Sequence, residues 1–271
     1  MTDRFLLYID LLGFSEIVRS KSELLPDLFR ILDNSNAHKH GDFRVIQFSD
    51  TLLVYNDPEV KSAHDHSYVA MYLCEFAQEI HYMLLGRDVF LRGLVTYGQF
   101  DDTGPTPNSA YKNVRAFWGN ALIKAYRAES GIQAVGLFVD DTVRPHMDIF
   151  ETHPYDADGG IWFVDTATMM RGLFLEGSDF TYAKMDITAT GNESLLAYDL
   201  VYLKRLYEHG HDNTLPPRVR TKYLTTWEIY RRKYPGLCRA LEEHEFAFDK
   251  VIDIDWKPFI DKIGTPEGFF G

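Results

Sequence analysis

Two aspartates stand at the ends of apolar runs, where a strand can present a carboxylate at the edge of a sheet. Asp10 closes the run FLLYID, and Asp50 follows a second apolar run at a Ser-Asp turn. An unpaired buried carboxylate is costly, so Asp10 needs a partner, and a helix N-terminus or a nearby Lys or Arg is the plainest one. Two carboxylates together suit Mg²⁺ or Mn²⁺, hard cations that also bind substrate phosphates. The pair therefore predicts metal-assisted phosphoryl transfer if the fold brings the two runs together.

An arginine farther along the chain is a candidate for stabilising phosphate charge. Two metal ions can activate an attacking hydroxyl and neutralise a leaving oxygen, but charge on the transferring phosphorus needs a further cation. A guanidinium suits this role because its planar fork matches phosphate oxygens. In the helix-like segment WGNALIKAYRAE, Asn120, Ile123 and Arg127 fall on one helical face. That face is either an ordinary solvated surface or part of an active site.

The order of predicted elements indicates how these residues meet. Strands are expected at residues 5–11, in two runs within 42–57, and at 88–98 and 132–140, and helices at 15–33, 64–85 and 117–130. This β-α-β-β-α-β order, followed by α-β, is typical of a ferredoxin-like split βαβ with one further unit. In that fold the first strand lies beside the central hairpin, so Asp10 and Asp50 are expected at the same end of neighbouring strands. Carboxylates so close together repel each other unless a cation or a proton intervenes.

Composition narrows the class of protein. The chain has 271 residues, of which 45% are hydrophobic and 25% charged, as in ordinary globular proteins. Its 28 Lys and Arg against 40 Asp and Glu give a net charge of −12, which argues against nucleic acid as a partner. Two cysteines are too few for a disulfide framework or a Cys-ligated zinc site. Because no signal-peptide pattern or long apolar run appears, we expect a cytoplasmic protein with no membrane partner.

Four segments together resemble the catalytic domains of class III nucleotidyl cyclases. YIDLLGFSEIV, IQFSDTLLVY, LRGLVTYG and WGNALIKAYRAE occur in the order and spacing of that family. They are similar to its strand-Asp-x-x-Gly-Phe-Ser motif, its hairpin aspartate, and its Arg-x-Gly-Leu/Ile-x-x-Gly and Gly-Asn-x-x-x-x-Ala-x-Arg motifs. The resemblance covers about residues 5–143. It implies an α+β fold with a ferredoxin-like class III cyclase core, an antiparallel sheet flanked by helices, and a helical C-terminal extension.

The resemblance also implies how metal and triphosphate are bound. Asp10, Asp50 and the backbone carbonyl of Ile9 would hold two Mn²⁺ or Mg²⁺ ions per active site. Backbone N–H groups next to the following helix start, where the helix dipole favours an anion, would wrap the triphosphate. Those groups belong to Leu11, Leu12, Gly13 and Phe14.

The arginine in the fourth segment matches the family residue that supports the transition state. Family active sites lie at a homodimer interface, so Arg127 is expected to face the metal pair of the other subunit. The family normally carries an asparagine one turn before this arginine, where the chain has Ile123. Asn120, a turn earlier on the same face, is the candidate for that role. Arg92 matches another family arginine, for which a purely structural role is the plainer expectation.

The positions that would select the base depart from the family pattern. Adenylyl cyclases use Lys and Asp at two purine-reading positions and guanylyl cyclases use Glu and Cys, whereas this chain has Ile46 and Ala116. Neither side chain can hydrogen-bond a purine edge. Alternation puts Ile46 and Phe48 on the face of Asp50, so we expect an apolar nucleotide pocket, with Arg115 as a further lining residue. Because the metal aspartates and the catalytic arginine are retained, these departures favour an enzyme that acts on a pyrimidine nucleotide over an inactive relative of the family.

The chain most resembles the stand-alone pyrimidine cyclases of bacterial Pycsar anti-phage defence. The resemblance implies that the 3′-hydroxyl of UTP attacks the α-phosphorus, releasing pyrophosphate and 3′,5′-cyclic UMP for a cyclic-nucleotide-binding effector. Three alternatives stay open: a cytidylate cyclase making cyclic CMP, a non-catalytic nucleotide-sensing module, and a purine cyclase that uses Arg115 or backbone groups.

The end of the chain differs in character from the rest. We expect residues 1–190 to form the catalytic domain and residues 191–271 a helical extension packed on it. The extension is rich in helix formers and aromatic residues, with breaks at Pro216-Pro217 and Pro235-Gly236. It carries no motif of catalytic spacing, so we expect it to contribute no chemistry.

Overall fold

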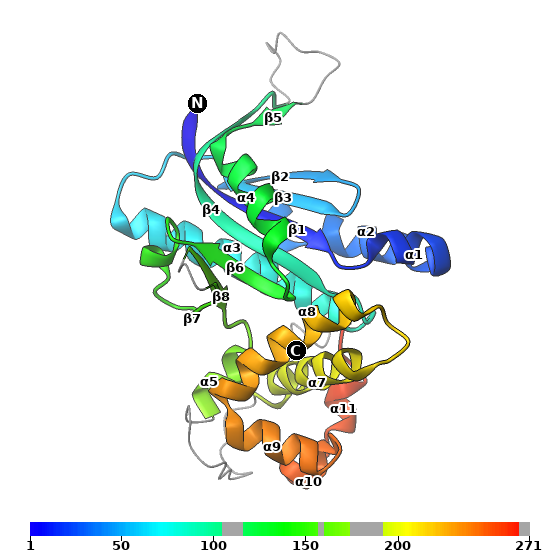
Figure 1. Cartoon of the computed structure of the whole chain (residues 1–271). Helices are drawn as coiled ribbons and strands as arrows, with labels where there is room; N and C mark the ends of the chain where they lie inside the picture. The colour runs from blue at the N-terminus through cyan, green and yellow to red at the C-terminus, as the bar shows by residue number, and fades with distance from the viewer. Residues whose placement is uncertain (105–115, 157–159, 174–191, 266–271) are drawn as a thin grey trace. The chain divides into compact units, whose positions relative to one another are not determined.

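The computed structural model forms two compact units (Figure 1). The residues that it describes are 1–104, 116–156, 160–173 and 192–265, with only the backbone at 171–173. The first unit comprises Met1–Ile80, Leu91–Ile132 and Gly136–Asp165, and the second comprises His81–Phe90, Gln133–Val135 and Thr166–Gly271. The expected catalytic domain over 1–190 and extension over 191–271 stay predictions.

The first unit is built on a sheet whose strand order is β2-β3-β1-β4-β6-β8-β7, with β5 paired to β4. All neighbouring strands are antiparallel except β4 and β6, which are parallel. The first four strands have the ferredoxin-like order, with β1 between the β2–β3 hairpin and β4. This confirms the expected α+β fold class. The strands are β1 (Thr2–Leu11), β2 (Phe43–Phe48), β3 (Thr51–Asn56), β4 (Leu91–Asp102), β5 (Phe117–Trp118), β6 (Gly136–Asp140), β7 (Thr152–Pro154) and β8 (Ile161–Val164).

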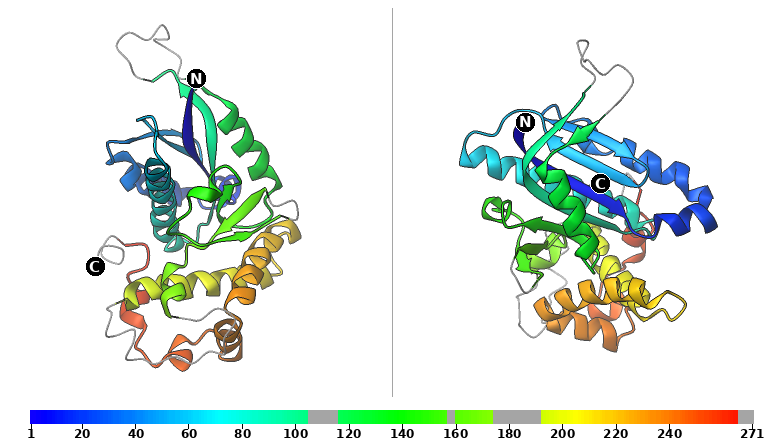
Figure 2. Two further views of the ribbon diagram at one scale, coloured as in Figure 1. Left: turned by 90° about the vertical axis from the view of Figure 1, so that its left-hand side faces the viewer. Right: turned by 45° about the horizontal axis from the view of Figure 1, so that its top comes forward.

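Two helices cover opposite faces of this sheet, α3 (Ala63–Leu85) and α4 (Asn120–Gly131) (Figures 1 and 2). The Phe5 ring of β1 lies 5.5 Å from the His66 ring of α3. On the other face, Thr96 of β4 donates a hydrogen bond to the carbonyl of Ala121 in α4. Since strand side chains alternate, Phe5, Leu7 and Ile9 face α3, whereas Leu6, Tyr8 and Asp10 lie on the α4 face. Residues 5–9 of β1 are an unbroken run of apolar and aromatic residues, and both faces of the strand are buried there.

Short helices complete the first unit. The segment after β1 forms α1 (Phe14–Ser20), a 3₁₀ turn (Ser22–Leu24) and α2 (Leu25–Asp33). Pro26 lies in the first turn of α2, where its missing N–H costs no helical hydrogen bond. Two further 3₁₀ turns span Asn36–His38 and Arg144–His146.

The second unit is helical, as expected for the end of the chain. Its core holds large buried aromatic side chains, among them Tyr198, Tyr202 and Trp227. The buried Asp199 carboxylate accepts hydrogen bonds from the Tyr82 hydroxyl at 2.8 Å and from backbone N–H groups at the start of α5. No described helix has the length and hydropathy that a membrane span requires. The helices are α5 (Thr168–Leu173), α7 (Glu193–His211), α8 (Pro217–Lys233), α9 (Pro235–Glu243), α10 (Phe248–Val251) and α11 (Lys257–Ile260).

Candidate active site

The sheet register brings the two aspartates together at one end of neighbouring strands. Asp10 of β1 pairs with Thr51 of β3, and Asp50 immediately precedes Thr51 in the two-residue turn that joins β2 to β3. Ser49, the first residue of that turn, has a φ of 52°, the left-handed conformation that tight hairpins use. Opposed residues of an antiparallel pair have Cα atoms only about 4.5–5.5 Å apart. Asp50, the neighbour of Thr51, therefore lies at the same end of the sheet as Asp10, and the role of both residues as metal ligands stays a prediction.

The charges of both carboxylates affect the pKa of a buried tyrosine, Tyr8. Tyr8 lies on the same face as Asp10, two residues earlier in β1. Burial raises the pKa of Tyr8, and the nearby charges of Asp10, Tyr126 and Asp50 raise it further, whereas a hydrogen bond with Thr51 opposes the shift. Both aspartates are thus close enough to act electrostatically on one phenol, which supports their convergence.

Asp10 also has a basic neighbour within the sheet. Arg92 is its register partner on β4, and the Nη2 atom of Arg92 lies 3.5 Å from Oδ2 of Asp10. The same guanidinium donates a hydrogen bond to the carbonyl of Ile132 at 2.9 Å and forms an ion pair with Glu129 of α4. Burial lowers the pKa of Arg92, and the charge of Asp10 opposes that shift. The plain partner expected for Asp10, a nearby arginine, is therefore present, and it also links Asp10 to α4.

Helix α4 is held against the sheet at its start, middle and end. Gly119, which precedes the helix, has a φ of 145°, and a Cβ atom there would lie 2.1 Å from the carbonyl oxygen of Gln99. Only glycine permits so close an approach of the helix to β4. In the middle, Lys124 forms an ion pair of 2.8 Å with the buried Asp140 at the end of β6. At its end, Glu129 pairs with the arginine beside Asp10.

The predicted catalytic face of α4 points to solvent. Asn120, Ile123 and Arg127 are all exposed, whereas Ala121 and Ala125 on the other side of the helix are buried. Within the part of the chain that the structure describes, the Arg127 guanidinium forms no ion pair. A single chain therefore does not bring this arginine onto the aspartates.

The expected nucleotide-pocket residues lie on β2 and the segment before β5. Ile46 and Phe48 share the face of Asp10, because Ile46 pairs with Leu53 and Phe48 with Thr51. Ile46 is buried, whereas the Phe48 ring is exposed and stacks on Phe117 with centroids 5.5 Å apart. Ala116 is partly exposed, and its backbone is hydrogen-bonded to Thr103. Arg115 lies outside the described residues.

The expected triphosphate loop links β1 to α1. Ile9 and Leu11 are buried in the sheet, Leu12 is partly exposed, and Gly13 is exposed with a φ of 75°. The Gly13 carbonyl accepts hydrogen bonds from two N–H groups of α1, which begins at Phe14, one residue earlier than expected. The contacts of this loop with metal and phosphate stay predictions.

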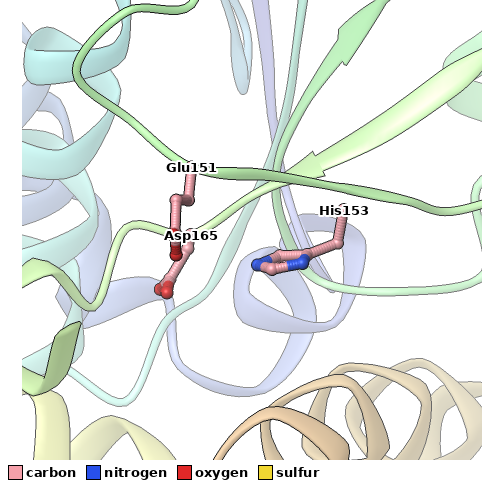
Figure 3. A group of neighbouring side chains, drawn as sticks. All are labelled: Glu151, His153 and Asp165. Carbon is pink, nitrogen blue, oxygen red and sulfur yellow. The ribbon is translucent and has the colours of Figure 1, made fainter. Parts of the chain in front are cut away.

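A second group of possible metal ligands was not anticipated from the sequence. Glu151, His153 and Asp165 lie at the β7–β8 hairpin, and their ligand atoms are all within 4.8 Å of one another (Figure 3). Among the described residues, it is the one group of three such side chains close enough to share an ion. The pattern Glu-Thr-His, which puts Glu151 and His153 on one face of a strand, is the signal that the sequence offered.

Comparisons with known proteins find structural similarity only. No protein-family model and no curated protein sequence matches the chain. The adenylyl cyclase CyaB from P. aeruginosa is 16% identical with a TM-score of 0.44, over 60% of this chain and 93% of that one. The guanylyl cyclase domain of the RhoGC fusion protein from the aquatic fungus Blastocladiella emersonii is 17% identical with a TM-score of 0.45, over 60% and 95%. A bacterial light-regulated adenylyl cyclase is 13% identical with a TM-score of 0.45, over 61% and 91%.

Proposed function

We propose that the chain is a class III nucleotidyl cyclase that converts UTP to 3′,5′-cyclic UMP and pyrophosphate. One observation carries the proposal: Asp10 pairs with Thr51, the residue after Asp50, at a sheet edge where both carboxylates are partly exposed. Paired carboxylates with access to solvent are the donor set that Mn²⁺ and Mg²⁺ prefer. The motif resemblance supports the same assignment, because its segments lie on β1, the β2–β3 turn, β4 and α4.

The proposed reaction is an in-line displacement at the α-phosphorus. Asp10, Asp50 and the Ile9 carbonyl would hold two ions, which when bound lower the pKa of a hydroxyl and neutralise a leaving oxygen. A bond forms between the ribose 3′-oxygen and the α-phosphorus, the bond to the bridging oxygen breaks, and the hydroxyl proton passes to solvent. The partner subunit's Arg127 would offer its guanidinium to the phosphoryl oxygens.

A homodimer explains why the arginine is exposed in a single chain. Large apolar side chains are exposed on the same helix, at Ile123 and Tyr126, and Trp118 is exposed on β5, just before the helix. Neighbouring exposed apolar groups of this kind are typical of interaction surfaces. In a two-fold dimer each active site would combine the aspartates of one subunit with the partner subunit's Arg127.

The pyrimidine substrate is proposed from the pocket residues. Ile46 is buried and Phe48 offers an exposed ring, so the surface on the Asp10 face of β2 can stack against a base without reading a purine edge by side-chain hydrogen bonds. Uridylate is our first choice and cytidylate the second. By the same resemblance, the product would act in the cytoplasm as a second messenger of anti-phage defence, through a cyclic-nucleotide-binding effector.

A non-catalytic nucleotide-sensing module is the second candidate. Two observations favour it: Ile123 stands where the family has an asparagine, and Arg92 already provides Asp10 with a positive partner at 3.5 Å. Such a module would bind a nucleoside triphosphate without turning it over.

Incubation with each of four radiolabelled nucleoside triphosphates and Mn²⁺, followed by chromatography, tests the proposal. We expect labelled cyclic UMP from UTP, and no cyclic product from Asp10→Ala or Asp50→Ala proteins whose circular dichroism is unchanged. Arg30→Ala, which removes an exposed arginine of α2, is the matched control and should keep full activity. Nucleotide binding without product would favour the sensing module, and full activity of either aspartate variant would overturn the metal assignment.

A further inference from the structure

The β7–β8 hairpin brings two carboxylates and an imidazole onto one face of the sheet. The pairing of Thr152 with Val164 continues to Glu151 and Asp165, and the N–H of Asp165 donates a hydrogen bond to the Glu151 carbonyl at 2.9 Å. His153, two residues after Glu151, lies on the same side of its strand. Figure 3 shows the two carboxylates next to each other, with one edge of the His153 ring directed toward them.

We propose that Glu151, His153 and Asp165 form a Zn²⁺ site that clamps β7 to β8. Zinc sites with three protein ligands keep the fourth position open to water, and their metal–ligand distances are about 2.0–2.2 Å. Ligand atoms around such an ion are then about 3.4 Å apart, so the group, already within 4.8 Å, closes by small side-chain rotations.

The donor types select the kind of ion. Imidazole favours transition metals such as Zn²⁺, whereas Mg²⁺ and Ca²⁺ prefer sites made of oxygen alone. Like charges directly opposed on neighbouring strands repel each other. Asp165 is only 2% exposed, so solvent screens its charge weakly. A divalent ion between Glu151 and Asp165 would be attracted to both carboxylates, and the imidazole of His153 would complete the donor set.

This site is separate from the proposed catalytic metals. Asp10 of β1 pairs with Arg92 of β4, and Arg92 pairs with Gly136 of β6. The register of β6 with β8, continued by one residue, places Asp165 beside Gly136. Asp10 and Asp165 thus lie in one row, three strand spacings or about 14 Å apart. No single ion can contact both residues, so each site can be removed without deleting a ligand of the other.

The proposal is tested by calorimetric titration of the metal-stripped full chain with Zn²⁺. Excess Mg²⁺ is present to occupy the proposed site at Asp10 and Asp50. We expect one Zn²⁺ per chain, retained when Asp10 and Asp50 are both changed to alanine. His153→Ala and Glu151→Gln should each weaken binding by about 100-fold or more. The matched control is His209→Ala, which removes a histidine that contacts a single carboxylate, Asp88, at 2.9 Å; it should leave the titration unchanged.

Hydrogen exchange provides a second measurement on the same proteins. Zinc should slow exchange of the β7 and β8 amides in the unmodified chain but not in His153→Ala. Absence of stoichiometric binding to the unmodified chain would overturn the proposal. Binding that survives both His153→Ala and Glu151→Gln, or that is lost in His209→Ala, would overturn it as well. None of these outcomes depends on cyclase activity.

Discussion

Replacing Arg92 with alanine should strongly destabilise the first unit. Arg92 is 7% exposed, and its guanidinium contacts the Ile132 carbonyl at 2.9 Å, Glu129, and Asp10 at 3.5 Å. Alanine leaves Glu129, itself 9% exposed, without this cation and the Ile132 carbonyl without this donor. Removing one partner of a buried ion pair costs about 3–5 kcal/mol. The lost hydrogen bond overlaps with that cost, so we expect a loss of about 4 kcal/mol.

Native-state hydrogen exchange of the amides of β1 and β4 measures this loss where it occurs. The method reports the free energy of opening at each amide, so the loss is read at the strands that carry Asp10 and Arg92. Each 1.4 kcal/mol changes an opening equilibrium by a factor of about ten. A loss of about 4 kcal/mol should therefore accelerate exchange at these strands by about a thousandfold.

The matched control is Arg44→Ala, which removes an exposed ion pair. Arg44 and Asp57 are 2.7 Å apart, but their side chains are 58% and 41% exposed. Exposed pairs contribute no more than about 1 kcal/mol, so exchange should change by about fivefold at most. A double variant, Arg92→Met with Glu129→Leu, should recover much of the loss because an apolar pair removes both buried charges. Equal effects of Arg92→Ala and Arg44→Ala would refute the argument that burial makes the Arg92 network strong.

Two further predictions concern assembly and acid stability. Asp10→Ala and Arg127→Ala proteins should each be inactive but recover about one quarter of wild-type activity when mixed, because about half of the exchanged dimers are heterodimers with one intact site. No recovery despite demonstrated subunit exchange would mean that each chain completes its own site. Burial lowers the pKa of His81 to about 4, so the unfolded chain binds more protons than the folded chain between about pH 6.5 and 4. The free energy of unfolding should therefore fall by on the order of 3 kcal/mol as the pH drops through that window. Urea denaturation of His81→Phe, which keeps a ring against Tyr202, should show a smaller fall, and an equal fall would contradict the assignment.

The sequence by itself determined the order of β1, β2, β3, α3, β4, α4 and β6 in the first unit. The unbroken apolar run before Asp10 predicts a strand buried on both faces, and β1 is such a strand. The Ser49-Asp50 pair between two β-rich runs predicts a hairpin turn, which the structure contains. These features are local, because alternation and turn preference act between residues close together in the chain. The β-α-β-β-α-β order then restricts the sheet topology enough to place Asp10 near Asp50.

Only the tertiary structure decided which distant side chains meet. Arg92 bridges Asp10 and Glu129 because β4 pairs with β1 in one register while α4 lies across both strands, and no spacing in the sequence encodes that crossing. The zinc site that we propose needs Glu151 opposite Asp165, and this depends on pairing of two strands only three and four residues long. Strands so short carry little periodicity of their own, so their register depends on tertiary pairing, of β8 with β6 and of β7 with β8. The exposure of the predicted catalytic face of α4 likewise follows from which side of that helix the sheet buries.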